Sequence, residues 1–180
     1  MEVHRSQRQG AIQQTGRKLD LAIEGEGWFR LQTPQGVRYT RRGDFAMDAS
    51  GRLQNAQGHL LLASAAPLSL PNADFEIDAQ GAVKLGNGAV DRILLGQLQE
   101  GEALEYVGDG LYAAARDLPA IAPGPGTASI RQGAIERGNV DPLQEMVAMM
   151  QTVRHFGSSA QALRAYDQML DAAINQSGSF

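Results

Sequence analysis

The sequence of 180 residues contains no cysteine, so it forms no disulfide and offers no thiolate ligand to a metal. No apolar run approaches the roughly 20 residues that a membrane-spanning helix needs, and we therefore expect no lipid-embedded segment. The first ten residues are polar and lack the apolar core of a cleaved secretory signal peptide. These absences favour a chain that is cytosolic, or exported without a cleaved signal.

Aromatic residues are also few, and the net charge is small. The chain has one Trp, four Tyr and five Phe, but 43% of its residues are hydrophobic, which is enough for a core. A net charge of −4 argues against a nucleic-acid partner or an acidic membrane surface. The length fits one domain, or one domain with an appendage.

Motifs for catalysis and metal binding are missing as well. No ligand spacing relates the three histidines, His4, His59 and His155. Asp44 and Asp48 do not match a calcium loop, and the Gly25–Gly27 segment lacks the third glycine of a dinucleotide loop. Ser158 has no nucleophile elbow around it. We therefore predict that the chain has no catalytic, cofactor-binding or metal-binding residue and that it is not an enzyme.

Short alternating segments dominate the first three quarters of the chain. Leu19, Leu21 and Ile23 share one face of a predicted half-buried strand at 19–24. Further strands are predicted between turns rich in Gly, Pro and Asp, at 28–32, 37–40, 43–47, 52–54 and 59–63. We predict an extended leading segment at 1–18 and an irregular β-domain of hairpins at 19–136.

Two internal repeats occur within this region. Residues 45–53 match residues 75–83, and both read as strand, Asp-Ala-x-Gly turn, strand. The second repeat is identical over five positions, because residues 8–12 recur as 131–135. These copies stand where the chain enters and leaves the β-domain, so we predict that they lie side by side and close it.

The last forty residues predict a long helix within a C-terminal segment at 137–180. Asp141 can cap its first N–H groups, Pro142 suits the first helical position, and Gln144 stands where a capping box has Glu or Gln. A helix from Pro142 to about Asn175 is roughly 50 Å long at 1.5 Å per residue. The expected fold class is therefore mainly β with a long C-terminal α-helix of coiled-coil type.

An apolar seam runs along this predicted helix, with a period of about 3.4 that is nearer the 3.5 of a coiled coil than 3.6. It either packs on the chain's own β-domain or binds a partner helix, and its length and period favour the partner. The seam consists of Val140, Leu143, Met146, Met150, Val153, Phe156, Ala160, Leu163, Tyr166, Leu170 and Ile174.

Three segments resemble motifs of the flagellar rod and hook family, the axial proteins of the bacterial flagellum. Segment 15–29 resembles the family's TGxxLDxAIxGxGFF, segment 39–53 its YTRxGxFxxDxxGxL, and segment 132–146 its QGxLExSNVNPxxEM. The length and residues 166–170 look most like a proximal or distal rod protein. The matching motif residues are Leu19, Asp20, Gly25, Gly27, Tyr39, Thr40, Arg41, Gly43, Gly133, Asn139 and Val140.

The resemblance implies a structural subunit of the basal-body rod, whose partners are other rod and hook subunits and itself. Family members begin with a helix that pairs with the C-terminal one, and this sequence lacks that helix. The resemblance thus implies a partner for the seam. Gly138 departs from the family, which usually has Ser there.

Two other functions stay open from the sequence. One is a hydrolase on a small β-scaffold that uses Asp44 or Asp109, and the other is a free adaptor that offers its helix to a groove. Three arginines form a basic cluster, for which we favour a solvated face over a subunit contact: Arg38, Arg41 and Arg42. We expect Trp28 and Phe29 to be core and edge of one strand.

Overall fold

The computed structural model describes residues 9–64, 66–70, 74–86, 88–99, 101–124, 126–138, 146–147 and 149–158. The chain divides into two compact units, Met1–Asn139 and Val140–Phe180. Among the described residues, all strands belong to the first unit and the helical residues to the second. The prediction of a mainly β fold is therefore confirmed.

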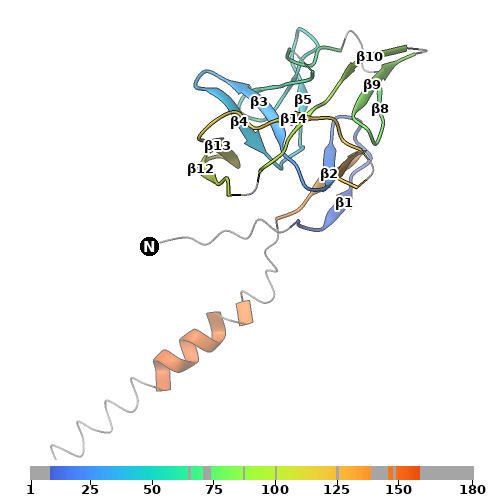
Figure 1. Ribbon diagram of the computed structural model, residues 1–180. Helices are drawn as coiled ribbons and strands as arrows, with labels where there is room; N and C mark the ends of the chain where they lie inside the picture. Colours follow the sequence, from blue (N-terminus) through green and yellow to red (C-terminus); the bar gives the residue numbers. More distant parts are fainter. Residues whose placement is uncertain are drawn as a thin grey trace, which may run out of the picture. The chain divides into compact units, whose positions relative to one another are not determined.

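The first unit contains short strands joined by tight turns (Figure 1). In chain order they are β1 (Ile12–Gln14), β2 (Leu21–Gly25), β3 (Phe29–Thr33), β4 (Gly36–Thr40), β5 (Ala46–Met47), β6 (Leu53–Gln54), β7 (Leu60–Leu61), β8 (Glu76–Ile77), β9 (Ala82–Leu85), β10 (Gly88–Arg92), β11 (Leu95–Gly96), β12 (Leu104–Gly108), β13 (Leu111–Ala114), β14 (Ala120–Ile121), β15 (Ala128–Gln132) and β16 (Ala134–Glu136).

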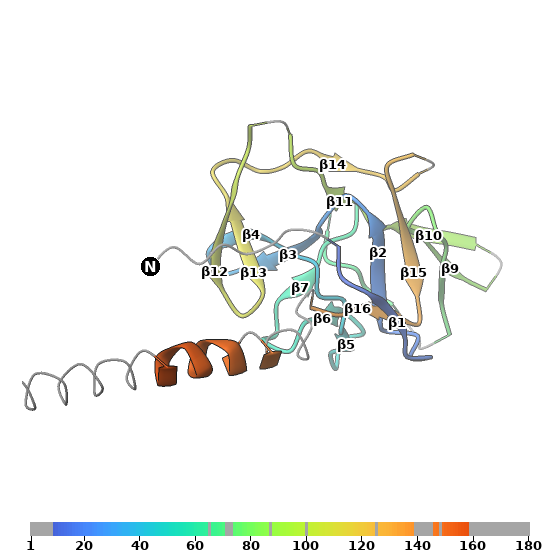
Figure 2. The same cartoon turned by 90° about the horizontal axis from the view of Figure 1, so that it is seen from below.

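These strands form one large sheet and several small ones. The large sheet has the order β12-β13-β4-β3-β7-β6-β5, and a second sheet has the order β10-β9-β8. Three two-stranded ladders join distant parts of the chain: β1 with β16, β2 with β15, and β11 with β14. Figure 2 shows β2 and β15 side by side, and every pairing between strands is antiparallel.

Two hydrophobic clusters lie on opposite faces of β3. Phe29 and Leu31 are fully buried in the larger cluster, which collects side chains from most of the domain. Trp28 and Tyr39 belong to a smaller cluster with Leu118. Since successive residues of extended backbone point to opposite sides, Trp28, which immediately precedes β3, and Phe29, its first residue, enter different clusters. Trp28 is 8% exposed and Phe29 is 0% exposed, so both are core residues and the predicted edge position is wrong.

The strand predicted to be half-buried is buried on both faces. Asp20, Leu21, Ala22 and Ile23 are each at most 2% exposed. The alternating sequence does not give an exposed face, because Ala22 is small enough to be buried and because Asp20 makes hydrogen bonds inside the domain. Pairing with β15 places β2 inside the domain. Asp20, just before β2, is buried with one carboxylate oxygen bonded to the Thr15 hydroxyl and the other without a hydrogen bond.

The repeated Asp-Ala-x-Gly segments adopt the same turn. Asp48 Oδ1 accepts the N–H of Ser50 and of Arg52, both at 2.8 Å, and Asp78 Oδ1 accepts the corresponding two N–H groups at 3.1 and 2.9 Å. Asn55 makes a third copy, because its Oδ1 accepts two N–H groups at 3.1 and 2.9 Å. This copy was not predicted, although the sequence Asn-Ala-Gln-Gly carries the same signal.

Residues 146–147 and 149–158 of the second unit are helical. They lie inside the predicted long helix. The rest of that helix lies outside the described residues, so its full length stays a prediction.

Candidate assembly site

The first and last strands of the β-domain carry parts of the five-residue repeat. β1 pairs with β16, with Ile12 opposite Glu136. Just beyond the ladder, the N–H of Arg137 donates to the carbonyl of Ala11 at 2.9 Å. The two copies are neighbours but do not pair with one another: Ile12 of the first faces Glu136, just after the second, and Ala134 and Ile135 of the second face Gln14 and Gln13, just after the first. The predicted contact is therefore only partly present, and β1 brings part of the predicted leading segment into this ladder.

Arg41 binds two other stretches of chain at this place. Its Nε donates to Oε2 of Glu136 at 2.9 Å, and its Nη1 donates to the carbonyls of Gly25 at 2.9 Å and Gly27 at 2.7 Å. The guanidinium carbon lies 6.0 Å from the centre of the Trp28 ring, at the limit of a cation–π contact. The Arg41 side chain is only 19% exposed, so a solvated face is the wrong interpretation for it.

The other two arginines of the predicted cluster lie apart from this network. Arg42 binds Asp44 through two N–H groups at 3.1 and 2.8 Å, and its side chain is 55% exposed. The hydrogen bond to Asp44 raises the pKa of Arg42 above its usual value. Arg38 donates to the carbonyl of its neighbour Val37 at 3.0 Å.

Asp20 fixes the start of β2 against the end of β15. Its Oδ2 accepts the hydroxyl of Thr15 at 2.6 Å, and its carbonyl accepts the N–H of Gly133 at 2.8 Å. Its Oδ1 lies 3.8 Å from Nε of Arg17, which is an ion pair without a hydrogen bond. Two motif residues, Asp20 and Gly133, thus meet although 113 positions separate them (133 − 20).

Two motif glycines stand where backbones touch. A Cβ on Gly43 would lie 1.6 Å from the carbonyl oxygen of Leu21, whose N–H donates to Gly43 at 2.9 Å. A Cβ on Gly25 would lie 2.7 Å from the carbonyl oxygen of Thr127, and Gly25 also has a φ of +102°. Only glycine leaves room for these approaches.

The remaining motif residues bind within the domain too. Tyr39 is 1% exposed, its hydroxyl accepts the N–H of Leu118 at 2.8 Å, and burial raises the pKa of Tyr39. The Thr40 hydroxyl donates to the carbonyl of Gly110 at 2.8 Å. Leu19 packs, partly buried, against the larger cluster. The described motif residues therefore stabilise the fold of the domain, and their polar side chains point into it.

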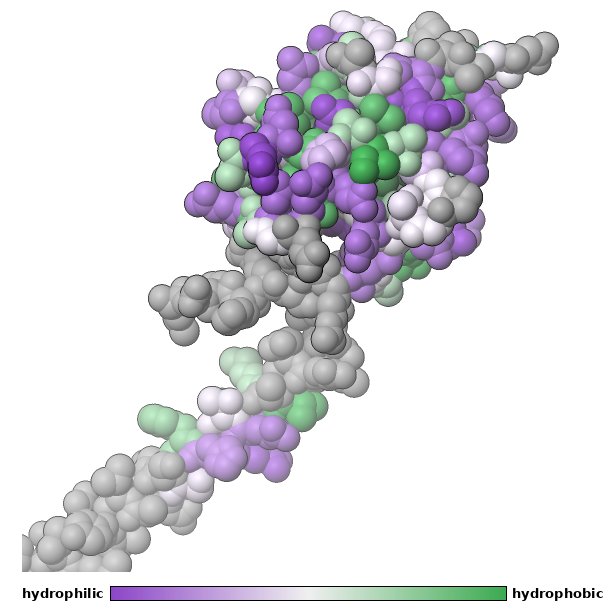
Figure 3. Space-filling view, in the orientation of Figure 1, coloured by the Kyte–Doolittle hydropathy of each residue, from purple (hydrophilic) through white to green (hydrophobic). Residues whose placement is uncertain are grey.

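The helical segment exposes large apolar side chains. Figure 3 shows hydrophobic atoms at its surface. Those exposed by 50–77% are Met146, Val147, Met149, Met150, Val153 and Phe156. Four of these six belong to the predicted seam, and Val147 and Met149 widen the apolar surface beyond it. The residues predicted for the seam or motif that lie outside the described part are Asn139, Val140, Leu143, Ala160, Leu163, Tyr166, Leu170 and Ile174.

The two acids of the hydrolase hypothesis line one small pocket. Asp44 and Asp109 lie there with Arg42, and the pocket has a volume of about 10 Å³. That space holds about one water molecule. Because Asp44 is already paired with Arg42, the pocket offers neither room for a substrate nor a free acid pair.

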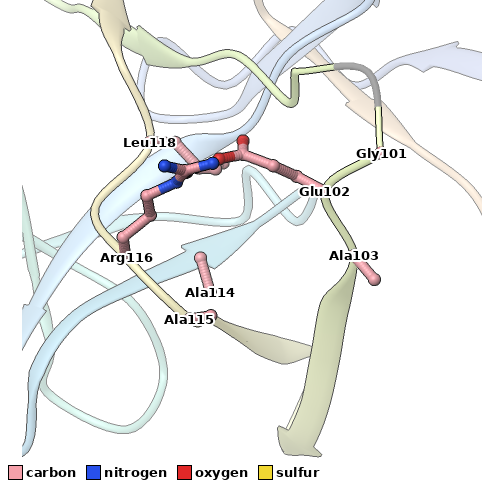
Figure 4. Close-up of a pocket in the computed structure, with 7 residues that line it drawn as sticks. All are labelled: Gly101, Glu102, Ala103, Ala114, Ala115, Arg116 and Leu118. Atoms are coloured by element: carbon pink, nitrogen blue, oxygen red, sulfur yellow. Dashed lines mark hydrogen bonds and ion pairs between the residues drawn. The ribbon is translucent and has the colours of Figure 1, made fainter.

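A larger pocket of about 450 Å³ lies at the base of the β12–β13 hairpin (Figure 4). Alanines and Leu118 line most of it, and Glu102 and Arg116 point toward one another at 2.7 Å. The hydrogen bond from Arg116 lowers the pKa of Glu102. The two charged lining residues thus neutralise each other, and the pocket presents no pair of groups suited to acid–base catalysis.

In the described part of the chain, no three His, Asp or Glu side chains gather in a group that could hold a metal ion. No helix in that part is long and apolar enough to cross a membrane.

Glu136 is the important residue that the predicted site omitted. Its side chain is 11% exposed and binds both Arg41 and the N–H of Gly10. It stands inside the quoted QGxLE motif, so the signal was present in the sequence. The partner was not visible, because 95 positions separate Arg41 from Glu136.

Two family models match the chain. Residues 22–88 match the D1 domain of the flagellar hook protein FlgE/F/G family, and residues 131–176 match the C-terminal region of the flagellar basal body rod FlgEFG proteins. The first match covers β2 to the start of β10, and the second begins in β15 and contains the exposed helical segment.

Curated relatives extend the similarity over nearly the whole sequence. The flagellar basal-body rod protein FlgF of Mesorhizobium japonicum is 33% identical, over 94% of this chain and 71% of its own length. FlgG of Bacillus subtilis is 31% identical, over 92% of this chain and 67% of its own length. FlgF of Rhizobium meliloti is 32% identical, over 96% and 73%.

Proposed function

Because the chain belongs to the flagellar basal-body rod and hook protein family, we propose that it is a structural subunit of the bacterial flagellar rod. This proposal is supported above all by the exposed apolar surface of residues 146–147 and 149–158, which lies inside the matched C-terminal region. The motif residues of the β-domain turn inward and stabilise its own fold. The helical segment, by contrast, offers a large apolar surface to a neighbouring subunit.

The seam provides the free energy for this assembly. Fully burying a Met, Val or Phe side chain stabilises association by about 1.5–3 kcal/mol relative to leaving it exposed. Met150 and Phe156 are 63% and 77% exposed, so most of their surface is still available. A helix from a neighbouring rod or hook subunit, with its own apolar stripe, is the partner that such a seam fits.

The same family membership supports a place for the protein in the cell: it resides in the basal body, as part of the periplasm-spanning rod, to which it is exported. Its partners are other rod and hook subunits and further copies of itself. Its role is assembly, with the β-domain setting spacing and lateral contacts.

The test changes the seam without touching the β-domain. Met150→Asp with Phe156→Asp places two charges where apolar contacts are expected, and a buried unpaired charge costs several kcal/mol. The matched control, Gln151→Asp with Ser158→Asp, adds the same charge to polar positions of the same helical segment. Both are expressed from the native gene in a bacterium that lacks its own copy.

We expect the control to restore swimming in soft agar, and the seam variant to be exported but excluded from purified basal bodies. Circular dichroism of both purified chains shows whether the β-domain is intact. Normal swimming of the seam variant would refute the assembly role of the seam. Exclusion of both variants alike would show that added charge, and not the seam, is responsible.

A further inference from the structure

Glu136 gathers two distant parts of the chain at the edge of the β-domain. Its Oε2 accepts the Nε–H of Arg41 at 2.9 Å, and its Oε1 accepts the backbone N–H of Gly10 at 2.8 Å. Arg41 extends the network to the carbonyls of Gly25 and Gly27. One carboxylate therefore ties the incoming chain, the outgoing chain and the β2–β3 turn together.

This carboxylate stands at the first pair of the β1–β16 ladder. The ladder is antiparallel, with Ile12 opposite Glu136 and Gln14 opposite Ala134. The chain before Ile12 and the chain after Glu136 consequently leave from the same end of the ladder. A ladder of this kind opens from that end, one pair after another, so the first pair resists the separation of the two chain ends.

The ion pair is suited to hold that first pair. Arg41 and Glu136 are 19% and 11% exposed, so water and salt screen them less than a surface pair. Charge-assisted hydrogen bonds are about twice as strong as neutral ones. The neighbouring Arg42–Asp44 pair has a similar separation of 2.8 Å but is 55% and 41% exposed, and surface pairs contribute little.

We propose that the Arg41–Glu136 pair is a clamp that keeps the outer end of the β1–β16 ladder closed. In the rod, the clamp keeps the chain just before Ile12 close to the chain just after Glu136. Glu136 lies four positions before the second unit begins at Val140 (140 − 136). Arg41 and Glu136 are thus positioning residues for assembly. Only this use in the rod rests on the proposed function; the closing of the ladder does not.

Amide hydrogen exchange of the full chain tests the clamp directly. Arg41→Gln, Glu136→Gln and the double variant are compared with Arg42→Gln, which removes the exposed ion pair next to the clamp. Each single clamp variant should raise exchange in residues 11–14 and 134–137 about ten-fold or more, because a charge-assisted hydrogen bond is lost. The double variant should add little, since both changes break one pair.

The exchange of the Val83 amide, within β9, serves as the internal reference. It should stay unchanged in all variants, as should the ladder in Arg42→Gln. Ladder exchange equal to wild type in Glu136→Gln would overturn the clamp. An equal increase at Val83 would overturn it as well, because the pair would then stabilise the whole domain. If Arg41→Gln does not fold, the ladder exchange measured in Glu136→Gln alone tests the clamp.

Swimming of bacteria that carry Glu136→Gln separates the clamp from the proposed function. We expect reduced swimming and fewer variant subunits in basal bodies, with Arg42→Gln at the wild-type level. An opened ladder with normal swimming would overturn the role of the clamp in the rod. If the wild-type chain itself fails to restore swimming, the proposed function is wrong. The hydrogen-exchange test of the ladder does not depend on that outcome.

Discussion

Replacing Gly51 by alanine tests whether backbone contact between the turns and neighbouring stretches of chain holds the β-domain together. Gly51 has a φ of +79°, and a Cβ there would lie 2.3 Å from the carbonyl oxygen of Leu70. The carbonyl of Gly51 also accepts the N–H of Leu70 at 2.7 Å. Alanine therefore introduces backbone strain and also forces this hydrogen-bonded contact apart.

Gly16 provides a control with the same backbone conformation. Its φ is +76°, but no atom lies within 4 Å of the position of an added Cβ. Gly16→Ala should cost only the left-handed strain of an L-residue, about 1–2 kcal/mol. Gly51→Ala adds the loss of the bond to Leu70, and an unsatisfied buried N–H costs about 1–3 kcal/mol more. The expected total is about 2–5 kcal/mol.

Thermal unfolding followed by circular dichroism measures the difference. For a domain of this size, about 1 kcal/mol corresponds to roughly 3–5 °C in Tm. We expect Gly51→Ala to lower Tm by roughly 10 °C or more, and Gly16→Ala by roughly half as much. Gly81→Ala should resemble Gly51→Ala, since its Cβ would lie 2.6 Å from the carbonyl of Ile93. Equal Tm values for Gly16→Ala and Gly51→Ala would refute the close approach as the cause.

The remaining predictions concern acid, a buried hydroxyl and the exposed seam. Hydrogen bonds from the Arg52 backbone lower the pKa of Asp48; at Asp78 burial raises the pKa, but hydrogen bonds outweigh it. Their folded pKa values lie below the unfolded ones, so the stability they contribute is present above about pH 4 and is lost as pH falls further. Tm measured from pH 7 to pH 2 should show this loss, and Asp48→Asn with Asp78→Asn should reduce it while keeping the fold. Tyr39→Phe leaves the N–H of Leu118 without its acceptor and should cost about 1–3 kcal/mol in urea unfolding; no change would mean that water replaces the hydroxyl. Light scattering of the full chain over a concentration series should show self-association, which a fragment ending at residue 138 should lack.

The turns and the secondary-structure class could be predicted because their causes are local. Asp48 and Asp78 bond N–H groups two and four residues further on, so each turn lies within five positions of the chain. The third turn, at Asn55, has the same sequence pattern and could have been predicted in the same way. The apolar spacing of residues 146–156 likewise depends only on the helical period, and the described part of it is helical and exposed.

Long-range contacts were decided by the tertiary structure. The motif singled out Arg41 from Arg38 and Arg42, but no local pattern predicts that Arg41 is turned inward while the exposed Arg42 binds its neighbour Asp44. A similar limit applies to Gly43, whose need for glycine comes from the backbone of Leu21 on another strand. An ion pair or a close approach between segments tens of residues apart depends on how the sheets fold together. The sequence by itself determined which residues can turn, pair or form an apolar stripe, and the packing of the domain determined which of them meet.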